Sequence, residues 1–181
     1  AYESALKCGV LDRHEHIVPI AGFLKAITPM PAVFDQHYVK RLQGTNLKQA
    51  KTKRELAEAL RKDIRDFKAA HGCDRLVLVW CASTEIFITP GPAHQTIETF
   101  EKAMEVNDPA IAPSMLYAWA AIMEAVPFAN GAPNLTCDVP AIEALAKQRR
   151  VAVGGKDFKT GQTMIKTVLS PMFKARMLGV S

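Results

Sequence analysis

Three short apolar runs, separated by helical patterns, constrain the fold of this chain more than any other feature. The runs lie at 75–82 (RLVLVWCA), 126–133 (VPFANGAP) and 151–155 (VAVGG). The first run is continuous and rich in β-branched residues, which is typical of a parallel strand that is buried on both faces. Strands that alternate with helices in this way predict an α/β fold built on a parallel sheet.

The segment before the first run has the pattern of an amphipathic helix. Thr52 can cap its start, Glu55 can complete a capping box, and Gly72 can end it. Its apolar face repeats at steps of three and four residues: Leu56, Leu60, Ile64 and Phe67. Earlier in the chain, we expect a short helix closed near Gly9 and an extended loop over the proline-punctuated stretch 17–35.

Helices are also expected between and after the other two runs. We place them over about 93–106, from Pro113 onward, and from a cap at Asp138 to about Gln148. A last helix begins near Gly161. Four apolar side chains of this last helix are expected to be buried: Ile165, Val168, Leu169 and Met172.

Composition excludes several classes of protein. Apolar residues make up 49% of the chain and charged residues 23%, whereas a disordered chain carries far fewer apolar residues. No apolar run approaches the roughly 20 residues of a membrane-spanning helix, so we expect no membrane association. The four cysteines form no CxxC pair, which favours a reducing, cytoplasmic setting.

The distribution of charge singles out the C-terminal part of the chain. Residues 40–68 carry ten basic and four acidic side chains in a helical pattern, which is typical of a solvated helix face. Residues 147–181 carry eight basic and one acidic, which favours an anion as ligand. No nucleic-acid-binding signature is present, so nucleic acid is not the expected partner. Residues 14–16 (HEH) offer two histidines as ligands, but adjacent residues point in different directions, so we expect no metal site.

Small and polar residues follow each of the three apolar runs. The three loops are 81–85 (CASTE), 130–134 (NGAPN) and 156–163 (KDFKTGQT). Ligands of open parallel sheets bind beyond the carboxyl ends of the strands, so the three loops together predict one ligand cleft. Taken singly, each loop is explained as well by the ordinary preference of Gly, Asn, Pro and Ser for turns.

The third loop predicts an anion site. Thr160, Gly161, Gln162 and Thr163 lie where a loop gives way to a helix, and the free N–H groups of a helix start favour an anion. Gly161 permits close approach, and Lys156 supplies positive charge together with Lys159. Phosphate is therefore the hypothesis, although neither a Walker A loop nor a GxGxxG motif occurs in these 181 residues.

At these loops the sequence resembles the myo-inositol phosphate synthase family. Residues 154–163 (GGKDFKTGQT) are similar to the family's Gly-Asp-Asp-Phe-Lys-Ser-Gly-Gln-Thr signature. Residues 77–85 (VLVWCASTE) resemble its Trp-Thr-Ala-Asn-Thr-Glu turn, and 114–134 the stretch that leads to Pro-Phe-Ile-Asn-Gly-Ser-Pro. The order and approximate spacing agree from about Val10 to Gly179.

The resemblance implies a Rossmann-like NAD-binding fold and a specific reaction. Residues 1–160 would form the second part of the NAD-binding domain, and 161–181 a phosphate-binding helix that opens the catalytic and oligomerisation domain. The family converts D-glucose 6-phosphate to a myo-inositol monophosphate, on the route to inositol and phospholipids. Bound NAD oxidises the sugar, an intramolecular aldol step closes the ring, and the NADH formed reduces the product. A homotetramer is implied by the resemblance alone.

The resemblance also assigns residues to the two ligands. Six residues would line NAD together with Thr160: Ala82, Ser83, Thr84, Gly131, Ala132 and Asp157. Thr160–Thr163 would hold the substrate phosphate. The sequence departs from the family pattern at several of these positions and their neighbours, most clearly at Cys81, Ser83, Ala132, Lys156 and Thr160.

Parts of the family pattern lie outside this chain. The glycine-rich loop would precede Ala1, and the catalytic lysines would follow Ser181, so no catalytic residue is assigned here. We therefore expect a segment of a longer enzyme that does not turn over alone. The alternative is a non-catalytic α/β module that binds an anion through the third loop.

Overall fold

The chain divides into two compact units. The computed structural model describes residues 1–158 and 162–177, and the side chains of 162–164 are outside the described part. The first unit comprises 1–34 and 44–48, and the second comprises 35–43 and 49–181. Among the described residues, no helix combines the length and apolar character needed to cross a membrane.

The first unit consists of short helices. They are α1 (Tyr2–Cys8), the π-helical turn η1 (Arg13–Ile17) and α2 (Ala21–Ala26). Gly9 ends α1 in the left-handed region, with φ of 62°, as predicted. The prediction of a continuous extended loop over 17–35 is wrong at α2. Its segment lies between two prolines but contains none, so nothing prevents a helical turn there.

The second unit is built on a parallel three-stranded sheet. Its strands are β1 (Leu78–Trp80), β2 (Phe128–Asn130) and β3 (Val153–Gly154), in the order β1-β2-β3. Leu78 lies opposite Phe128, which lies opposite Val153. The predicted α/β fold with a parallel sheet is confirmed. The helical elements of this unit are α3 (Lys53–Ala70), the 3-10 turn η2 (Pro92–His94), α4 (Ile97–Glu105), α5 (Pro113–Met123), α6 (Pro140–Arg149) and α7 (Gln162–Ala175).

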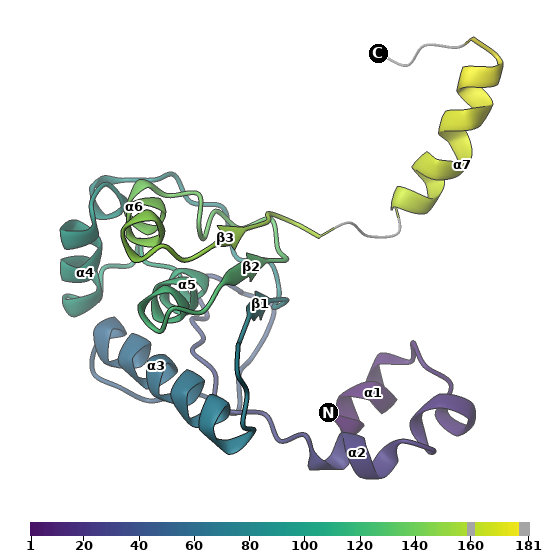
Figure 1. Cartoon of the computed structure of the whole chain (residues 1–181), viewed down its shortest axis with the longest axis horizontal. Helices are drawn as coiled ribbons and strands as arrows, with labels where there is room; N and C mark the ends of the chain where they lie inside the picture. The colour runs from purple at the N-terminus through teal and green to yellow at the C-terminus, as the bar shows by residue number, and fades with distance from the viewer. Residues whose placement is uncertain (159–161, 178–181) are drawn as a thin grey trace. The chain divides into compact units, whose positions relative to one another are not determined.

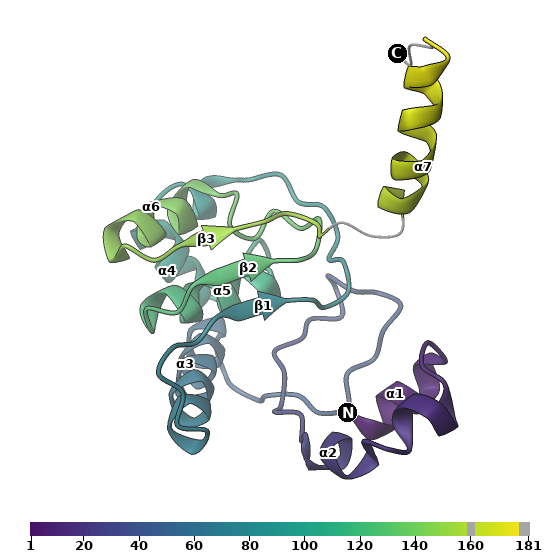
Figure 2. The same ribbon diagram turned by 45° about the vertical axis from the view of Figure 1, so that its right-hand side comes forward.

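Helices α3, α4, α5 and α6 form a layer on one face of the sheet (Figures 1 and 2). The central helix is α5, which packs against α3, α6 and β2. Nine of its eleven residues are buried, because its sequence is apolar around the whole circumference. The largest fully buried side chain is Trp119 of α5.

The opposite face of the sheet is open within the described part of the chain. Val77 and Val79 are 64% and 48% exposed, whereas Trp80 is 8% exposed. The prediction that the first apolar run is buried on both faces is therefore wrong for this chain. A continuous apolar run has the composition for two-sided burial, but the described helices cover one side only.

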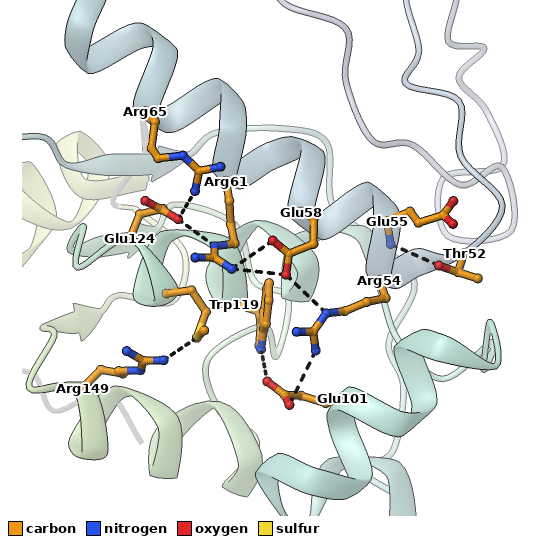
Figure 3. A network of polar contacts seen from close by, with 11 residues as sticks. Thr52, Arg54, Glu55, Glu58, Arg61, Arg65, Glu101, Trp119, Glu124 and Arg149 are labelled. Carbon is orange, nitrogen blue, oxygen red and sulfur yellow. Dashed lines mark hydrogen bonds and ion pairs between the residues drawn. The ribbon is translucent and has the colours of Figure 1, made fainter.

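Arginine side chains from α3 cover Trp119 (Figure 3). Arg54 and Arg61 place their guanidinium carbons 4.6 and 5.8 Å from the centre of the indole ring. The indole N–H donates to Glu101 of α4 at 3.2 Å. At the far end of α5, Glu124 accepts hydrogen bonds from Arg61 and Arg65 at 2.7 and 2.5 Å. The basic helix face is thus paired with acids rather than open to an anion.

The start of α3 agrees with the prediction in part. The Thr52 hydroxyl accepts from the Glu55 N–H at 3.1 Å, which confirms the cap. The Glu55 carboxylate accepts from Lys51, one residue before the position that a capping box requires. On the predicted apolar face, Leu60 is buried but Phe67 is 42% exposed, because α3 extends beyond the helices that cover it.

Two other helix starts differ from the prediction. Helix α4 begins at Ile97 rather than near 93, because Thr96 and Thr99 form a capping box after the 3-10 turn. Helix α6 begins at Pro140, and Val139 rather than Asp138 occupies its cap position. The Asp138 carboxylate instead pairs with Lys156 at 2.5 Å.

Helix α7 begins close to the predicted position, but the prediction that its apolar face is buried is wrong. Ile165 and Val168 are 60% and 66% exposed, and Leu169 and Met172 are 36% and 49% exposed. The helical spacing of these residues is typical of a face that packs against other protein, and the described residues provide no cover for it.

Candidate functional site

The three polar loops meet at the carboxyl edge of the sheet. The Gly131 N–H donates to the carbonyl of Trp80, the last residue of β1, at 2.8 Å. The Glu85 N–H donates to the Asn134 side chain at 2.9 Å, which joins the loops after β1 and β2. The Gly131 carbonyl accepts from the Phe158 N–H at 3.2 Å, and the Ala132 carbonyl from the Asp157 N–H at 3.0 Å. The loop after β3 is therefore bonded to the loop after β2. The predicted convergence of the loops at one edge is confirmed.

Glycine is required at two positions in this edge. A Cβ at Gly131 would lie 2.7 Å from the Trp80 carbonyl oxygen and 2.8 Å from the Phe158 ring. Gly155 has φ of +79°, and a Cβ there would lie 2.7 Å from the Asn130 carbonyl oxygen. The loops approach each other so closely that only a residue without a side chain fits at these positions.

A network of buried polar side chains connects the loops after β1 and β2 to the start of α5. Glu85, the last residue of the first loop, is 5% exposed and accepts from the Ser114 N–H at 2.9 Å and the Ser114 hydroxyl at 2.5 Å. Asn134 accepts from the Glu85 N–H at 2.9 Å and donates to its carboxylate at 3.3 Å. Thr136 donates to the Ser114 hydroxyl at 2.9 Å, and Asn130 to the Asn134 carbonyl at 2.9 Å.

Burial and hydrogen bonding shift the pKa of Glu85 in opposite directions. Burial raises the pKa of the Glu85 carboxyl above its ordinary value, while the hydrogen bonds from Ser114 oppose that shift. Ser114 lies in the first turn of α5, where a backbone N–H has no acceptor within the helix. The Glu85 carboxylate supplies that acceptor. A carboxylate at a helix start also interacts favourably with the helix dipole.

The residues predicted to line NAD lie on or beside this edge, except Thr160, which is outside the described residues. Ala82, Ser83, Thr84 and Asp157 are exposed and therefore accessible to a ligand. Ala132 is 4% exposed, and its N–H donates to the Asn130 side chain at 3.1 Å. A cavity of about 270 Å³ adjoins the loops, and among its lining residues are Thr84, Glu85, Met115, Pro133 and Asn134.

The predicted anion site lies largely outside the described residues. Lys159, Thr160 and Gly161 are not described, and of Gln162 and Thr163 only the backbone at the start of α7 is described. Lys156 forms an ion pair with Asp138, which offsets part of the positive charge that the prediction assigned to this loop. The phosphate contacts of 160–163 stay a prediction.

Sequence patterns placed Glu85 in a polar loop but gave it no role. Its partners Ser114 and Asn134 are 29 and 49 residues away in the chain. No local spacing signals such contacts. The one usable signal was the set of polar residues within otherwise apolar segments, because buried polar groups require partners. Among the described residues, no group of three or more metal-binding side chains comes together.

A parallel sheet with a polar loop after each strand defines the class of a Rossmann-like nucleotide-binding domain. The model of the myo-inositol-1-phosphate synthase family matches residues 1–178, and this chain belongs to that family. The matched model is that of the family's NAD-binding domain, and NAD is the cofactor of this domain.

Known synthases share this sequence and fold. The chain is 52% identical over 182 residues to inositol-3-phosphate synthase 1 of Bacteroides thetaiotaomicron, covering 100% of this chain and 42% of that protein. It is 41% identical over 157 residues to the synthase of Dictyostelium discoideum, covering 84% and 30%. The crystal structure of inositol-3-phosphate synthase from Caenorhabditis elegans superposes with a TM-score of 0.86 at 28% identity, covering 97% of this chain and 35% of that one. The chain thus spans less than half the length of these relatives.

Proposed function

We propose that this chain is a segment of an isomerase that converts D-glucose 6-phosphate to a myo-inositol monophosphate. The observation that carries the proposal is the joining of three polar loops at the carboxyl edge of the sheet, in a chain of the myo-inositol-1-phosphate synthase family. Parallel sheets bind nucleotides at this edge. The relatives named above are inositol-3-phosphate synthases.

Each part of the chain has a separate task in this proposal. Residues 1–160 belong to the NAD-binding domain, and 161–181 open the catalytic domain. When bound, NAD accepts a hydride from the sugar and can return it later in the reaction. The exposed loop 82–84, Gly131–Ala132 and Asp157 bind the cofactor, and Thr160 lies near its nicotinamide. Thr160–Thr163 bind the substrate phosphate at the start of α7, where free backbone N–H groups favour an anion.

The proposal extends to the assembly and its setting. A cytoplasmic homotetramer that feeds inositol phospholipid synthesis is supported by family membership alone. Sedimentation of the full-length protein tests the oligomeric state.

The test of the proposed function uses the full-length protein that contains this segment. Incubation with NAD and glucose 6-phosphate should give a myo-inositol monophosphate, identified by NMR, with no net consumption of NAD. Ser83→Trp should weaken NAD binding by about 10-fold or more, because a bulky ring at this exposed position obstructs the carboxyl edge. Titration calorimetry measures the affinity.

Thr89→Trp serves as the matched control, since Thr89 is also exposed and lies further along the same segment. Its NAD affinity should remain within about twofold of the unmodified protein. Absence of inositol phosphate as product contradicts the proposed reaction. Equal NAD affinity in the Ser83 and Thr89 variants contradicts the placement of the cofactor.

A further inference from the structure

Glu85 connects three elements at the carboxyl edge of the sheet. It is the last residue of the loop after β1, and its carboxylate accepts hydrogen bonds from Ser114 at the start of α5. Its backbone and its side chain both form hydrogen bonds with Asn134 in the loop after β2. Among the described residues, it is the only acidic side chain in the buried set. A buried carboxylate requires hydrogen-bond donors, and here each donor comes from a different element than its own loop.

The hydrogen bonds to the Glu85 carboxylate all have the same direction. Thr136 donates to the Ser114 hydroxyl, which donates to the carboxylate. The Ser114 N–H and the Asn134 amide also donate to it. All of these groups converge on an acceptor, so a carboxylate fits the site and an amide does not. Ala112, at the cap position of α5, offers no side-chain acceptor, so Glu85 satisfies the start of this helix from a remote loop.

This arrangement fixes the two loops relative to each other. The exposed residues 82–84 lie between β1 and Glu85, and Gly131–Ala132 lie between β2 and Asn134. Each loop is therefore held at the strand by the sheet and at its other end by the Glu85–Asn134 contact. A loop held at both ends loses less conformational freedom when a ligand binds.

We propose that Glu85 is a positioning residue for NAD, whose buried carboxylate holds the loops after β1 and β2 in the arrangement that the cofactor meets. This inference rests on the proposed NAD site. Glu85 does not contact the cofactor in this proposal, and it acts through Ser114 of α5 and Asn134 of the second loop.

The test replaces Glu85 in the full-length protein. Glu85→Gln keeps the shape but turns one acceptor into a donor that faces the Ser114 hydroxyl or the Asn134 amide. NAD affinity should fall by about 10-fold or more, as measured by titration calorimetry. Hydrogen–deuterium exchange should quicken in 82–85 and 130–134 and stay unchanged in α3 and α6.

Glu124→Gln is the matched control. Glu124 is a mostly buried carboxylate at the opposite end of α5 and accepts hydrogen bonds from Arg61 and Arg65. Helix α5 separates it from Ser114 by about 15 Å of helix rise. This variant should lower the melting temperature and leave both NAD affinity and the exchange of the two loops unchanged. If Glu85 has a purely structural role, Glu85→Gln should behave like Glu124→Gln: a lower melting temperature with unchanged NAD affinity and unchanged exchange of the two loops.

A second variant covers the case in which Glu85→Gln fails to fold. Asn134→Ala removes the contact between the loops but leaves the bonds from Glu85 to Ser114, and it should weaken NAD binding in the same direction. The positioning role is overturned if a folded Glu85 variant or a folded Asn134 variant binds NAD within twofold of the affinity of the unmodified protein. If the unmodified protein binds no NAD, the proposed function fails, and the positioning role fails with it.

Discussion

At the scale of single residues, Gly131 shows how closely the loops of the candidate site approach each other. Replacing it with Ala places a methyl group 2.7 Å from the Trp80 carbonyl oxygen. We expect Gly131→Ala to lower the free energy of unfolding by about 1–3 kcal/mol, as overpacking does elsewhere. Gly154→Ala is the control, because a Cβ there meets no atom within 4 Å. Chemical denaturation of both variants measures the difference, and equal stabilities would contradict the crowding at Gly131.

Cys137 illustrates how burial suppresses the chemistry of a side chain. It is 5% exposed, and burial together with the nearby Asp138 charge raises the pKa of its thiol to about 12, from an ordinary value of 9.0. Because the thiolate is the reactive form, we expect alkylation at pH 8 to be about 1000-fold slower than for an unperturbed thiol. Mass spectrometry after timed iodoacetamide treatment should show Cys8 and Cys81, which are exposed, modified first. Modification of Cys137 at the same rate in the folded protein would contradict this expectation.

At the scale of elements, α5 has a carboxylate in a polar contact at each end: Glu85 from a remote loop at its start, and its own cap residue Glu124 at its end. Glu85 satisfies its start, and Glu124 at its end accepts from Arg61 and Arg65 of α3. Figure 3 shows the second of these contacts beside the Trp119 cluster. Helix α5 carries no charged residue of its own between these ends, so its orientation depends on apolar packing and on these two polar contacts.

The contacts of Glu124 predict a stability difference between two kinds of ion pair. Its side chain is 13% exposed, and Glu124→Gln should lower the free energy of unfolding by about 1–3 kcal/mol. Asp66→Asn removes the acid of an exposed pair with Lys62, whose side chains are 54% and 70% exposed, and should cost less than about 1 kcal/mol. Urea denaturation at 0.15 and 1 M salt measures the free energy of unfolding of both variants. Salt should reduce the contribution of the exposed pair more than that of the buried pair, because it screens exposed charges more. An Asp66 variant that is less stable than the Glu124 variant would contradict this order.

At the scale of the whole molecule, the described chain leaves apolar surface open. Val77 and Val79 of the sheet and the apolar face of α7 are exposed. Exposed apolar faces of this kind mark surfaces that pack against other protein. The relatives, which are more than twice as long, have further chain that can supply such cover.

The lack of a pyrophosphate-binding motif in this chain predicts that the isolated chain binds NAD weakly. None of its 181 residues forms a GxGxxG motif, the loop that holds a dinucleotide pyrophosphate in this fold class. We expect the isolated chain to bind NAD at least about 100-fold more weakly than the full-length protein, with no turnover. Titration calorimetry of both proteins under one set of conditions measures this. Equal affinity would show that the pyrophosphate is held by residues of this chain.

The sequence by itself determined most of the elements and the edge at which the polar loops meet. Strands 78–80, 128–130 and 153–154, the cap at Thr52 and the polar loops all follow from spacing within a few residues. Signals of this kind are local, because a cap, a turn or an apolar period is set by neighbours in the chain. The same locality explains why the family motifs in the loops could be matched without a structure.

Only the tertiary structure decided which groups are partners. Asp138 had the sequence features of a helix cap but pairs with Lys156, and Glu85 had no predicted role but contacts Ser114 and Asn134. Val77 and Val79 belong to a run with the composition of a strand buried on both faces, and the apolar residues of α7 have the period of a buried helix face, but these residues are exposed. Hydrogen bonds and burial depend on atoms that folding brings together from 18 to 49 residues away, and no pattern within one segment contains that information.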